Sequence, residues 1–362
     1  RSSNMMREQN WLDQLRAYVA TINARPATTQ PALPPAPRRL GLALSGGGGK
    51  GSAHIGVLQV LEELTIPLDL IVGTSAGGAA AILYAAGMGL DTIREVFCNH
   101  ALRRIAHPDP TRTGLIGQRR REEVFSRVLG DRTFDDLHMP CAVVAADLVS
   151  GQAVVIREGS LVEAILATTA LPPVFSPVVR GDQVLVDGGI INNLPVDVAQ
   201  QLGANRVIAV ELSDAAAAFS LMVPNDDSPL ARLLLAPQQL NIAGRALSVL
   251  INHATALHLR DNPPDLLISP YVADLPLLDM NDPSKGQLAG LTAARDNAAE
   301  LLALRDWRMG EPEPLPVPAP PPAPIPTWTW PSLPNLPSLP FSLPRRDQTN
   351  PAETGPEPDR LP

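Results

Sequence analysis

The feature that most restricts the fold of this sequence is the alternation of short apolar runs with helical patterns across residues 39–308. The run LGLALS at 40–45 is typical of a buried strand, and the segment SAHIGVLQVLEEL that follows places its apolar residues at helical spacing. Further strands are expected at LDLIVG (68–73), CAVVAAD, QAVVIRE, QVLVDGG, RVIAVEL and PDLLISP. Strand–helix alternation predicts an α/β fold with a mostly parallel central sheet.

Two proline-rich segments flank this region. Residues 1–38 combine a short helical pattern with the linker TTQPALPPAPRR, and residues 309–362 are dense in proline. Proline at this density neither joins a sheet nor continues a helix, so we expect an extended tail without regular structure. Two interpretations of the tail stay open, a solvated linker and a polyproline segment that binds a partner protein.

Composition excludes several classes of protein. A formal net charge of −8 argues against a nucleic-acid partner. The two cysteines, Cys98 and Cys141, lie in apolar contexts and are expected to be small core residues, so we predict neither a disulfide nor a metal site.

Neither a secretory signal nor a membrane span is expected. The first residues contain no apolar h-region. The uncharged stretch from Leu70 to Leu90 has the length of a membrane span, but it turns sharply at GTSAGG, so we interpret it as a buried strand and helix. These features predict a cytoplasmic protein.

A glycine-rich loop, SGGGGKGSAHIG (45–56), follows the first predicted strand. Such a loop lets its backbone approach a phosphate, a dinucleotide or an oxyanion formed during a reaction. The spacing of Gly46, Gly48 and Gly51 matches the dinucleotide fingerprint, but the acidic residue that should end the second strand is missing, since Asp69 precedes it. The P-loop pattern fails because Gly51 follows Lys50 where serine or threonine is required.

The second predicted strand ends in a G-x-S-x-G motif. Its residues are Gly73, Thr74, Ser75, Ala76 and Gly77. A serine at a sharp strand-to-helix turn stands above the sheet, and the N-terminus of the following helix points at it. Because parallel strands end at one edge, the glycine loop is expected beside Ser75, where its N–H groups would stabilise an oxyanion.

The search for a base that activates Ser75 favours a carboxylate. None of the six histidines has a context that demands a catalytic role, although His54 lies beside the glycine loop, and His253 and His258 lie in a helical pattern. Asp187, by contrast, ends a predicted strand before Gly188 and Gly189. Core packing does not explain an aspartate in that position. It is therefore interpreted either as a functional residue or as a residue that forms the turn.

Taken together, these motifs resemble the patatin-like phospholipases, a family that includes bacterial homologues and the catalytic domain of neuropathy target esterase. The resemblance covers about 39–308 and implies a three-layer α/β/α hydrolase fold. It implies a Ser–Asp dyad of Ser75 and Asp187, with no catalytic histidine and no cofactor. It also implies an oxyanion hole formed by the glycine loop, whose six residues are Gly46, Gly47, Gly48, Gly49, Lys50 and Gly51.

The resemblance implies hydrolysis of a lipid carboxyl ester, such as a phospholipid or lysophospholipid, through an acyl-enzyme on Ser75. We expect Asp187 to be shielded from water, because burial would raise its pKa and make it a better base. Two alternatives stay open: a lipid-binding or scaffold protein with a vestigial site, and a nucleotide-binding module. We also expect peripheral contact with a membrane.

Two further segments are candidates for contact with lipid. Residues 214–244 are rich in small and apolar residues and are read either as a mobile lid or as a surface excursion with a short helix. Residues 102–132 carry eight arginines against four acidic residues, an excess of four positive charges. This excess is read either as a site for anionic head groups or as a solvated helix face.

Overall fold

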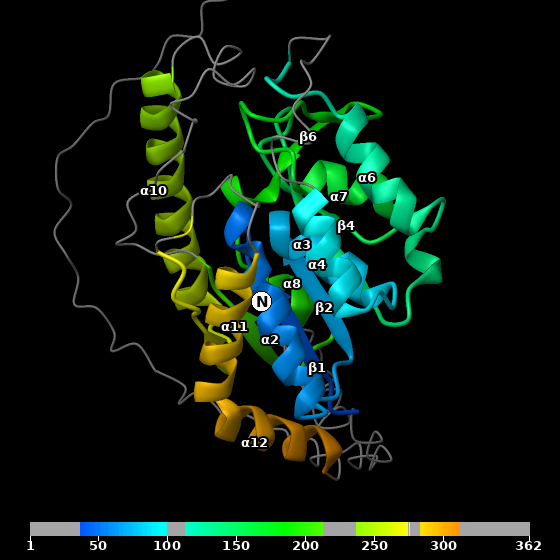
Figure 1. Ribbon diagram of the computed structural model, residues 1–362, viewed down its shortest axis with the longest axis vertical. Coiled ribbons are helices and arrows are strands. Elements are labelled where there is room, and N and C mark those ends of the chain that lie inside the picture. Colours follow the sequence, from blue (N-terminus) through cyan, green and yellow to red (C-terminus); the bar gives the residue numbers. More distant parts are fainter. Residues whose placement is uncertain (1–36, 100–112, 213–236, 274, 276–282, 311–362) are drawn as a thin grey trace, which may run out of the picture. The chain divides into compact units, whose positions relative to one another are not determined.

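The structure is a computed structural model that describes residues 37–99, 113–212, 237–273, 275 and 283–310 (Figure 1). The predicted N-terminal helix, the proline-rich tail beyond residue 310 and most of the predicted lid lie outside the described residues. The domain boundaries expected at residues 38 and 308 stay a prediction.

A single sheet organises the described residues and confirms the predicted α/β class. Its neighbouring strands follow the order β5-β6-β3-β2-β1-β7-β8, with β4 also paired to β3. The pairs along β3-β2-β1-β7-β8 are parallel, whereas β4, β5 and β6 pair antiparallel. The strands are β1 Leu40–Leu44, β2 Leu70–Thr74, β3 Cys141–Asp147, β4 Ala153–Ile156, β5 Val178–Arg180, β6 Gln183–Asp187, β7 Arg206–Val210 and β8 Leu266–Ile268.

Helices cover both faces of the sheet, so the expected three layers are present. Alternate strand residues divide between two apolar clusters, with Leu42 and Ile71 in the larger and Ala43 and Val72 in the smaller. The larger cluster receives apolar residues from α2 Ser52–Glu63, α3 Ser75–Ala85, α4 Leu90–Asn99, α6 Arg119–Leu129, α7 Leu161–Thr168, α11 Ser284–Asp296 and α12 Ala298–Met309. The smaller receives them from α8 Val196–Gln201 and from α10 Pro237–Asp261, which Figure 1 draws along one flank.

The carboxyl ends of β2 and β6 meet head to head along β3. Thr74 at the end of β2 is opposite Val144, and Asp187 at the end of β6 is opposite Ala145. Strand β4 pairs with both Val144 and Ala145, so it occupies one side of β3 and leaves the other to β2 and β6. Two strands that run in opposite directions therefore end at adjacent residues of a third.

Two helices have distinctive features. Asn297 separates α11 from α12, and its side-chain amide donates to the carbonyl of Ala293 at 2.8 Å at the end of α11. Helix α10 exposes apolar side chains, since Leu250 is 67% exposed.

The uncharged stretch from Leu70 to Leu90 forms β2 and α3, as expected. None of the helices in the described part of the chain has both the length and the hydropathy that a membrane crossing requires.

Candidate active site

Ser75 occupies a strained turn between β2 and α3. Its φ of +54° lies in the left-handed region that side-chain-bearing residues rarely adopt. The backbone N–H of Ser75 donates to the Oγ1 atom of Thr168 at 2.9 Å, and Thr168 itself donates to the carbonyl of Val144 at 2.5 Å. Gly77 is required in this turn, because a Cβ there would lie 2.5 Å from the carbonyl oxygen of Ser45. The structure thus places Ser75 in a sharp turn between a strand and a helix.

Asp187 lies within hydrogen-bond distance of the serine. The Oγ atom of Ser75 donates to Oδ2 of Asp187 at 2.5 Å, and the backbone N–H of Gly189 donates to Oδ1 at 2.8 Å. Asp187 is 4% exposed, so the expected shielding from water is found. Burial raises the pKa of Asp187 to about 6, although the bonds from Ser75 and Gly189 and the charge of Arg121 lower it. The carboxylate is therefore ionised at neutral pH, yet basic enough to accept a proton.

Gly188 lets β6 end this close to the serine. A Cβ on Gly188 would lie 2.6 Å from the carbonyl carbon of Val144, on the strand that β2 and β6 share. Any larger residue would push Asp187 away from Ser75.

The glycine loop lies beside Ser75, as predicted from the common edge of parallel strands. A Cβ on Gly46 would lie 3.1 Å from the Cβ atom of Ser75. Gly47 is the N-cap of the 3-10 helix η1, Gly48–Gly51, which leads into α2.

The N–H groups of this loop divide into two sets. Gly46 donates to the carbonyl of Asn193 at 3.1 Å, and Lys50 donates to that of Gly47 at 3.1 Å. Among the residues that the structure describes, the N–H groups of Gly47, Gly48 and Gly49 have no acceptor. Only this second set is open to an oxyanion.

Sequence reasoning missed several residues that hold these loops together. Thr74 donates from Oγ1 to the carbonyl of Asn192 at 2.9 Å, which ties the strand-to-helix turn to the segment after η3, Gly188–Ile190. Asn193 holds Gly46 through its carbonyl, so one asparagine pair positions both loops. The letters NNLP after the Asp-Gly-Gly motif are the only sequence signal for this role.

His54, which lies beside the glycine loop in the sequence, is a core residue. It is completely buried on α2, and its Nε2 atom lies 2.8 Å from the carbonyl oxygen of Ser45. Burial lowers the pKa of His54 to about 4, so the ring is neutral at pH 7. His253 is exposed on α10 and His258 is half-buried there.

No dinucleotide or metal site is assembled by the described residues. Asp69 lies at the amino end of β2, opposite the glycine loop, where Arg308 engages it through two bonds of 2.5 and 2.7 Å. It therefore does not approach the position that a ribose would occupy. No three His, Cys, Asp or Glu side chains in the described ranges gather as metal ligands.

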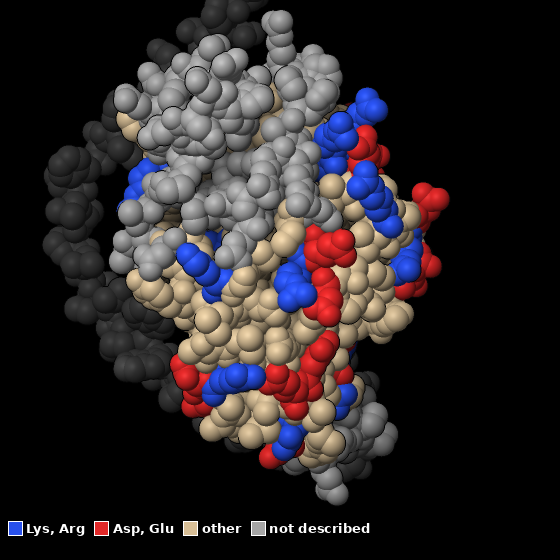
Figure 2. All heavy atoms as spheres, viewed as in Figure 1, with Lys and Arg blue, Asp and Glu red and all other residues tan. Residues whose placement is uncertain are grey.

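The basic excess predicted for residues 102–132 is weak in its described part. Arg121 is buried, which leaves four exposed arginines and three acidic residues in residues 113–132, an excess of one positive charge. Positive and negative groups alternate on the surface in Figure 2, and Glu123 pairs with both Arg119 and Arg120. These observations favour a solvated helix face.

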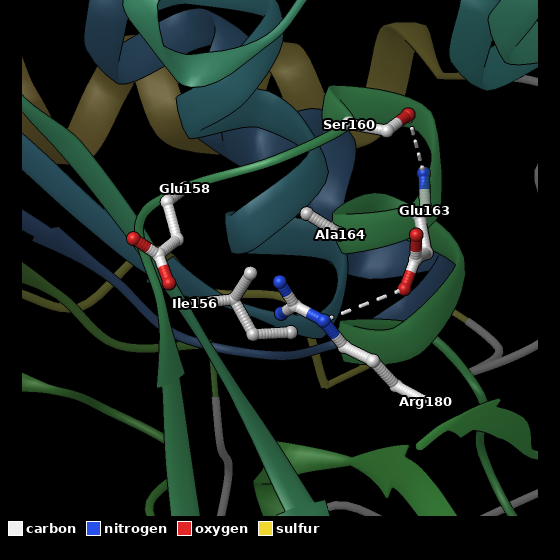
Figure 3. A pocket seen from close by; sticks show the side chains of 6 residues that line it. All are labelled: Ile156, Glu158, Ser160, Glu163, Ala164 and Arg180. Atoms are coloured by element: carbon white, nitrogen blue, oxygen red, sulfur yellow. Dashed lines mark hydrogen bonds and ion pairs between the residues drawn. The ribbon is translucent and has the colours of Figure 1, made fainter.

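A small hollow elsewhere shares no residue with the site. Figure 3 shows it between β4, the start of α7 and β5, with Arg180 and Glu163 paired across it at 3.7 Å. The pair is partly exposed, and we assign no ligand to this hollow.

Comparison with known proteins agrees with the motifs. Residues 42–199 match the family model described as patatin-like phospholipase, which confirms the resemblance predicted from the sequence. An uncharacterized NTE family protein of Mycobacterium tuberculosis is 32% identical over 71% of this chain and 46% of its own length. Patatin-like phospholipase domain-containing protein 6 of Homo sapiens is 33% identical over 48% of this chain and 13% of its own length. The chain thus spans less than half of either relative.

Two solved structures are similar at lower identity. VipD from Legionella pneumophila matches with a TM-score of 0.44 and 15% identity, over 75% of this chain and 68% of that one. The type III effector protein ExoU matches with a TM-score of 0.36 and 18% identity, over 75% and 54%.

Proposed function

Because residues 42–199 of this chain match the patatin-like phospholipase family model, we propose that the protein is a serine acyl hydrolase that cleaves lipid carboxyl esters. The observation that carries the proposal is the 2.5 Å hydrogen bond between Ser75 and the buried carboxylate of Asp187. A serine in a strained turn, bonded to a carboxylate with a pKa of about 6, is suited to nucleophilic catalysis.

In this proposal the reaction proceeds through an acyl-enzyme. The Oγ atom of Ser75 attacks the ester carbonyl carbon while its proton passes to Oδ2 of Asp187. The tetrahedral oxyanion is stabilised by the N–H groups of Gly47, Gly48 and Gly49 and by the positive end of the α3 dipole. The alcohol leaves with the proton from Asp187. Asp187 then takes a proton from water as the water oxygen attacks the acyl carbon. This proton passes to Oγ of Ser75 when the bond between Oγ and the acyl carbon breaks and the fatty acid leaves.

We propose phospholipids or lysophospholipids as the substrate class and a lipid surface as the place of action. Two hairpin tips project beyond the sheet edge at which Ser75 lies, one between β3 and β4 and one between β5 and β6. They are linked by the N–H of Leu148, which donates to the carbonyl of Val184 at 2.9 Å. Leu148 and Val149 in the first tip expose 57% and 66% of their surface, and Val179 on the neighbouring strand β5 exposes 70%, which supports contact with lipid.

The test compares the wild type with Ser75→Ala and Asp187→Asn on a short-chain p-nitrophenyl ester and on lysophospholipid. We expect both variants to lose about 10³-fold or more in kcat/KM, and a fluorophosphonate probe to label Ser75 in the wild type alone. The matched controls are Ser126→Ala and Asp135→Asn, which alter exposed residues outside the site.

Each outcome separates the candidate functions. Full activity in Ser75→Ala would exclude hydrolysis at this site. A wild type that binds lysophospholipid without turning over any ester would favour the alternative of a lipid-binding protein with a vestigial site.

A further inference from the structure

Arg121 is a fully buried arginine that the reaction described above does not use. It lies in the first turn of α6 and exposes none of its surface, unlike the exposed Arg119 and Arg120 beside it. Its guanidinium carbon lies 4.2 Å from the ring centre of Phe175, and Nη1 lies 3.4 Å from the side-chain oxygen of Gln118. A buried charge requires compensation, so its partners indicate its role.

Arg121 bonds to the residue that follows α7. The Nη2 atom donates to the carbonyl of Thr169 at 3.1 Å and also to its hydroxyl. The residues on either side of Thr169 hold the two halves of the site: Thr168 accepts from the N–H of Ser75 at 2.9 Å, and the carbonyl of Ala170 accepts from the N–H of Asp187 at 3.0 Å. Three consecutive residues thus connect the serine, the arginine and the aspartate.

Arg121 also acts on Asp187 through its charge. Burial lowers the pKa of Arg121 to about 9, and Asp187 raises it, so the guanidinium stays protonated at neutral pH. Arg121 is the charged group whose field lowers the pKa of this carboxyl. The described elements that pack against β6 and η3 carry the following other titratable residues: Asp147 on β3, which accepts bonds from Ser150 and Val184, Glu163 on α7, paired with Arg180 on β5, and Arg245, His253, His258, Arg260 and Asp261 on α10.

We propose that Arg121 is a positioning residue of the dyad, whose buried guanidinium holds the Thr168–Ala170 segment in place and keeps Asp187 in its ionised form. This inference rests on the proposed hydrolase function. During acylation the negative charge passes from Asp187 to the oxyanion on the substrate. A fixed positive charge in a dry environment keeps the carboxylate available as a base at the start of each cycle.

The test measures kcat/KM on a short-chain p-nitrophenyl ester against pH for the full chain. Arg121→Met and Arg121→Gln remove the charge, Arg121→Lys keeps it, and Arg120→Met removes a neighbouring exposed charge as the matched control. We expect the acidic limb of the wild type near pH 6, unchanged in Arg120→Met and close to that value in Arg121→Lys. In the neutral variants the limb should rise by about 1–3 pH units.

A purely structural role predicts a different result, a lower rate at every pH with no shift of the limb. A folded neutral variant with an unchanged limb would therefore overturn the inference. If neither neutral variant folds while Arg121→Lys folds with the wild-type profile, the requirement for the charge is supported.

A second readout does not depend on activity. The titration of Asp187 can be followed by carbon NMR of the full chain labelled at aspartate carboxyls, with Asp187→Asn used to assign the signal. If the wild type hydrolyses no ester, the proposed function fails, but this titration still decides whether Arg121 controls the ionisation of Asp187.

Discussion

At the scale of single residues, the site contains two features that each cost free energy: a strained backbone conformation and a buried carboxylate. Ser75 adopts a positive φ, which costs of order 1–3 kcal/mol, and Asp187 keeps a carboxylate at 4% exposure. Hydrogen bonds hold both residues. The N–H of Ser75 donates to the hydroxyl of Thr168, and the N–H of Gly189 donates to the carboxylate of Asp187. Such residues indicate that the surrounding structure is built to keep them in place.

The buried carboxylate should destabilise the protein at neutral pH. The pKa of Asp187 is about 6 in the folded state and 3.8 at its ordinary value, so only the folded state binds this proton between those values. The free energy of unfolding therefore falls as pH rises through this window, by at most about 3 kcal/mol. We expect Asp187→Asn to be more stable than the wild type at pH 8, by denaturant unfolding, and to lose that advantage by pH 4.

His54 does not disturb this comparison. Its depressed pKa gives the opposite slope, with stability lost as pH falls from 6.5 toward 4, but it does so equally in both proteins. A stability difference that is the same at pH 8 and pH 4 would contradict the prediction. The exposed Asp135→Asn serves as the control and should show no pH-dependent gain.

At the scale of elements, three strands and one helix end place Ser75 beside Asp187. Strands β2 and β6 end at adjacent residues of β3, and the last residue of α7, Thr168, bonds both Ser75 and Val144. The hydroxyl of Thr168 accepts one bond and donates the other, so a single side chain joins the strand-to-helix turn to the strand that aligns it.

Removing that hydroxyl should damage both stability and catalysis. In Thr168→Val the N–H of Ser75 and the carbonyl of Val144 each lose a partner, at about 1–3 kcal/mol for each buried group. We expect a lower free energy of unfolding and a reduced kcat on a soluble ester, because Ser75 can then relax from its positive φ. The control Thr168→Ser keeps the hydroxyl and should keep most of the activity. Equal activity in the valine and serine variants would show that the bond does not position Ser75.

At the scale of the whole described fold, the exposed apolar tips lie at the sheet edge that carries Ser75. The chain carries a net charge of −8, and its described basic segment has an excess of only one charge, so attraction to anionic head groups is a weak basis for membrane contact. The exposed apolar residues near the two hairpin tips give the proposed membrane contact better support than the charge of the basic segment does.

Making the β3–β4 tip polar should separate lipid binding from chemistry. We expect Leu148→Ser/Val149→Ser to lose about tenfold in hydrolysis of phospholipid in vesicles, while kcat/KM on a soluble ester stays unchanged. The control, Leu288→Ser, alters a residue of α11 with a comparable exposure of 64%. Equal losses on vesicles in both proteins, or a loss on the soluble ester, would contradict contact through this tip.

Local patterns predicted every strand of the sheet except the short β5 and indicated sharp turns at the glycine motifs. Apolar periodicity located β1 and β2 and the helices after them, because each pattern depends on neighbours only a few residues away. The glycines around Ser75 and after Asp187 are similarly local signals, since they report a backbone that leaves no room for a Cβ. These signals named the dyad residues, and their catalytic roles stay a prediction.

The tertiary structure alone decided how those residues meet. Parallel β2 and antiparallel β6 share one side of β3, and no periodicity records which strands pair or in which direction. The supporting contacts of Thr168, Asn192 and Arg121 join residues 48 to 118 positions apart, so neither partner carries a local mark of the other. Burial is likewise a property of the assembled fold, and it is burial that sets the pKa of Asp187 and separates Arg121 from its exposed neighbours.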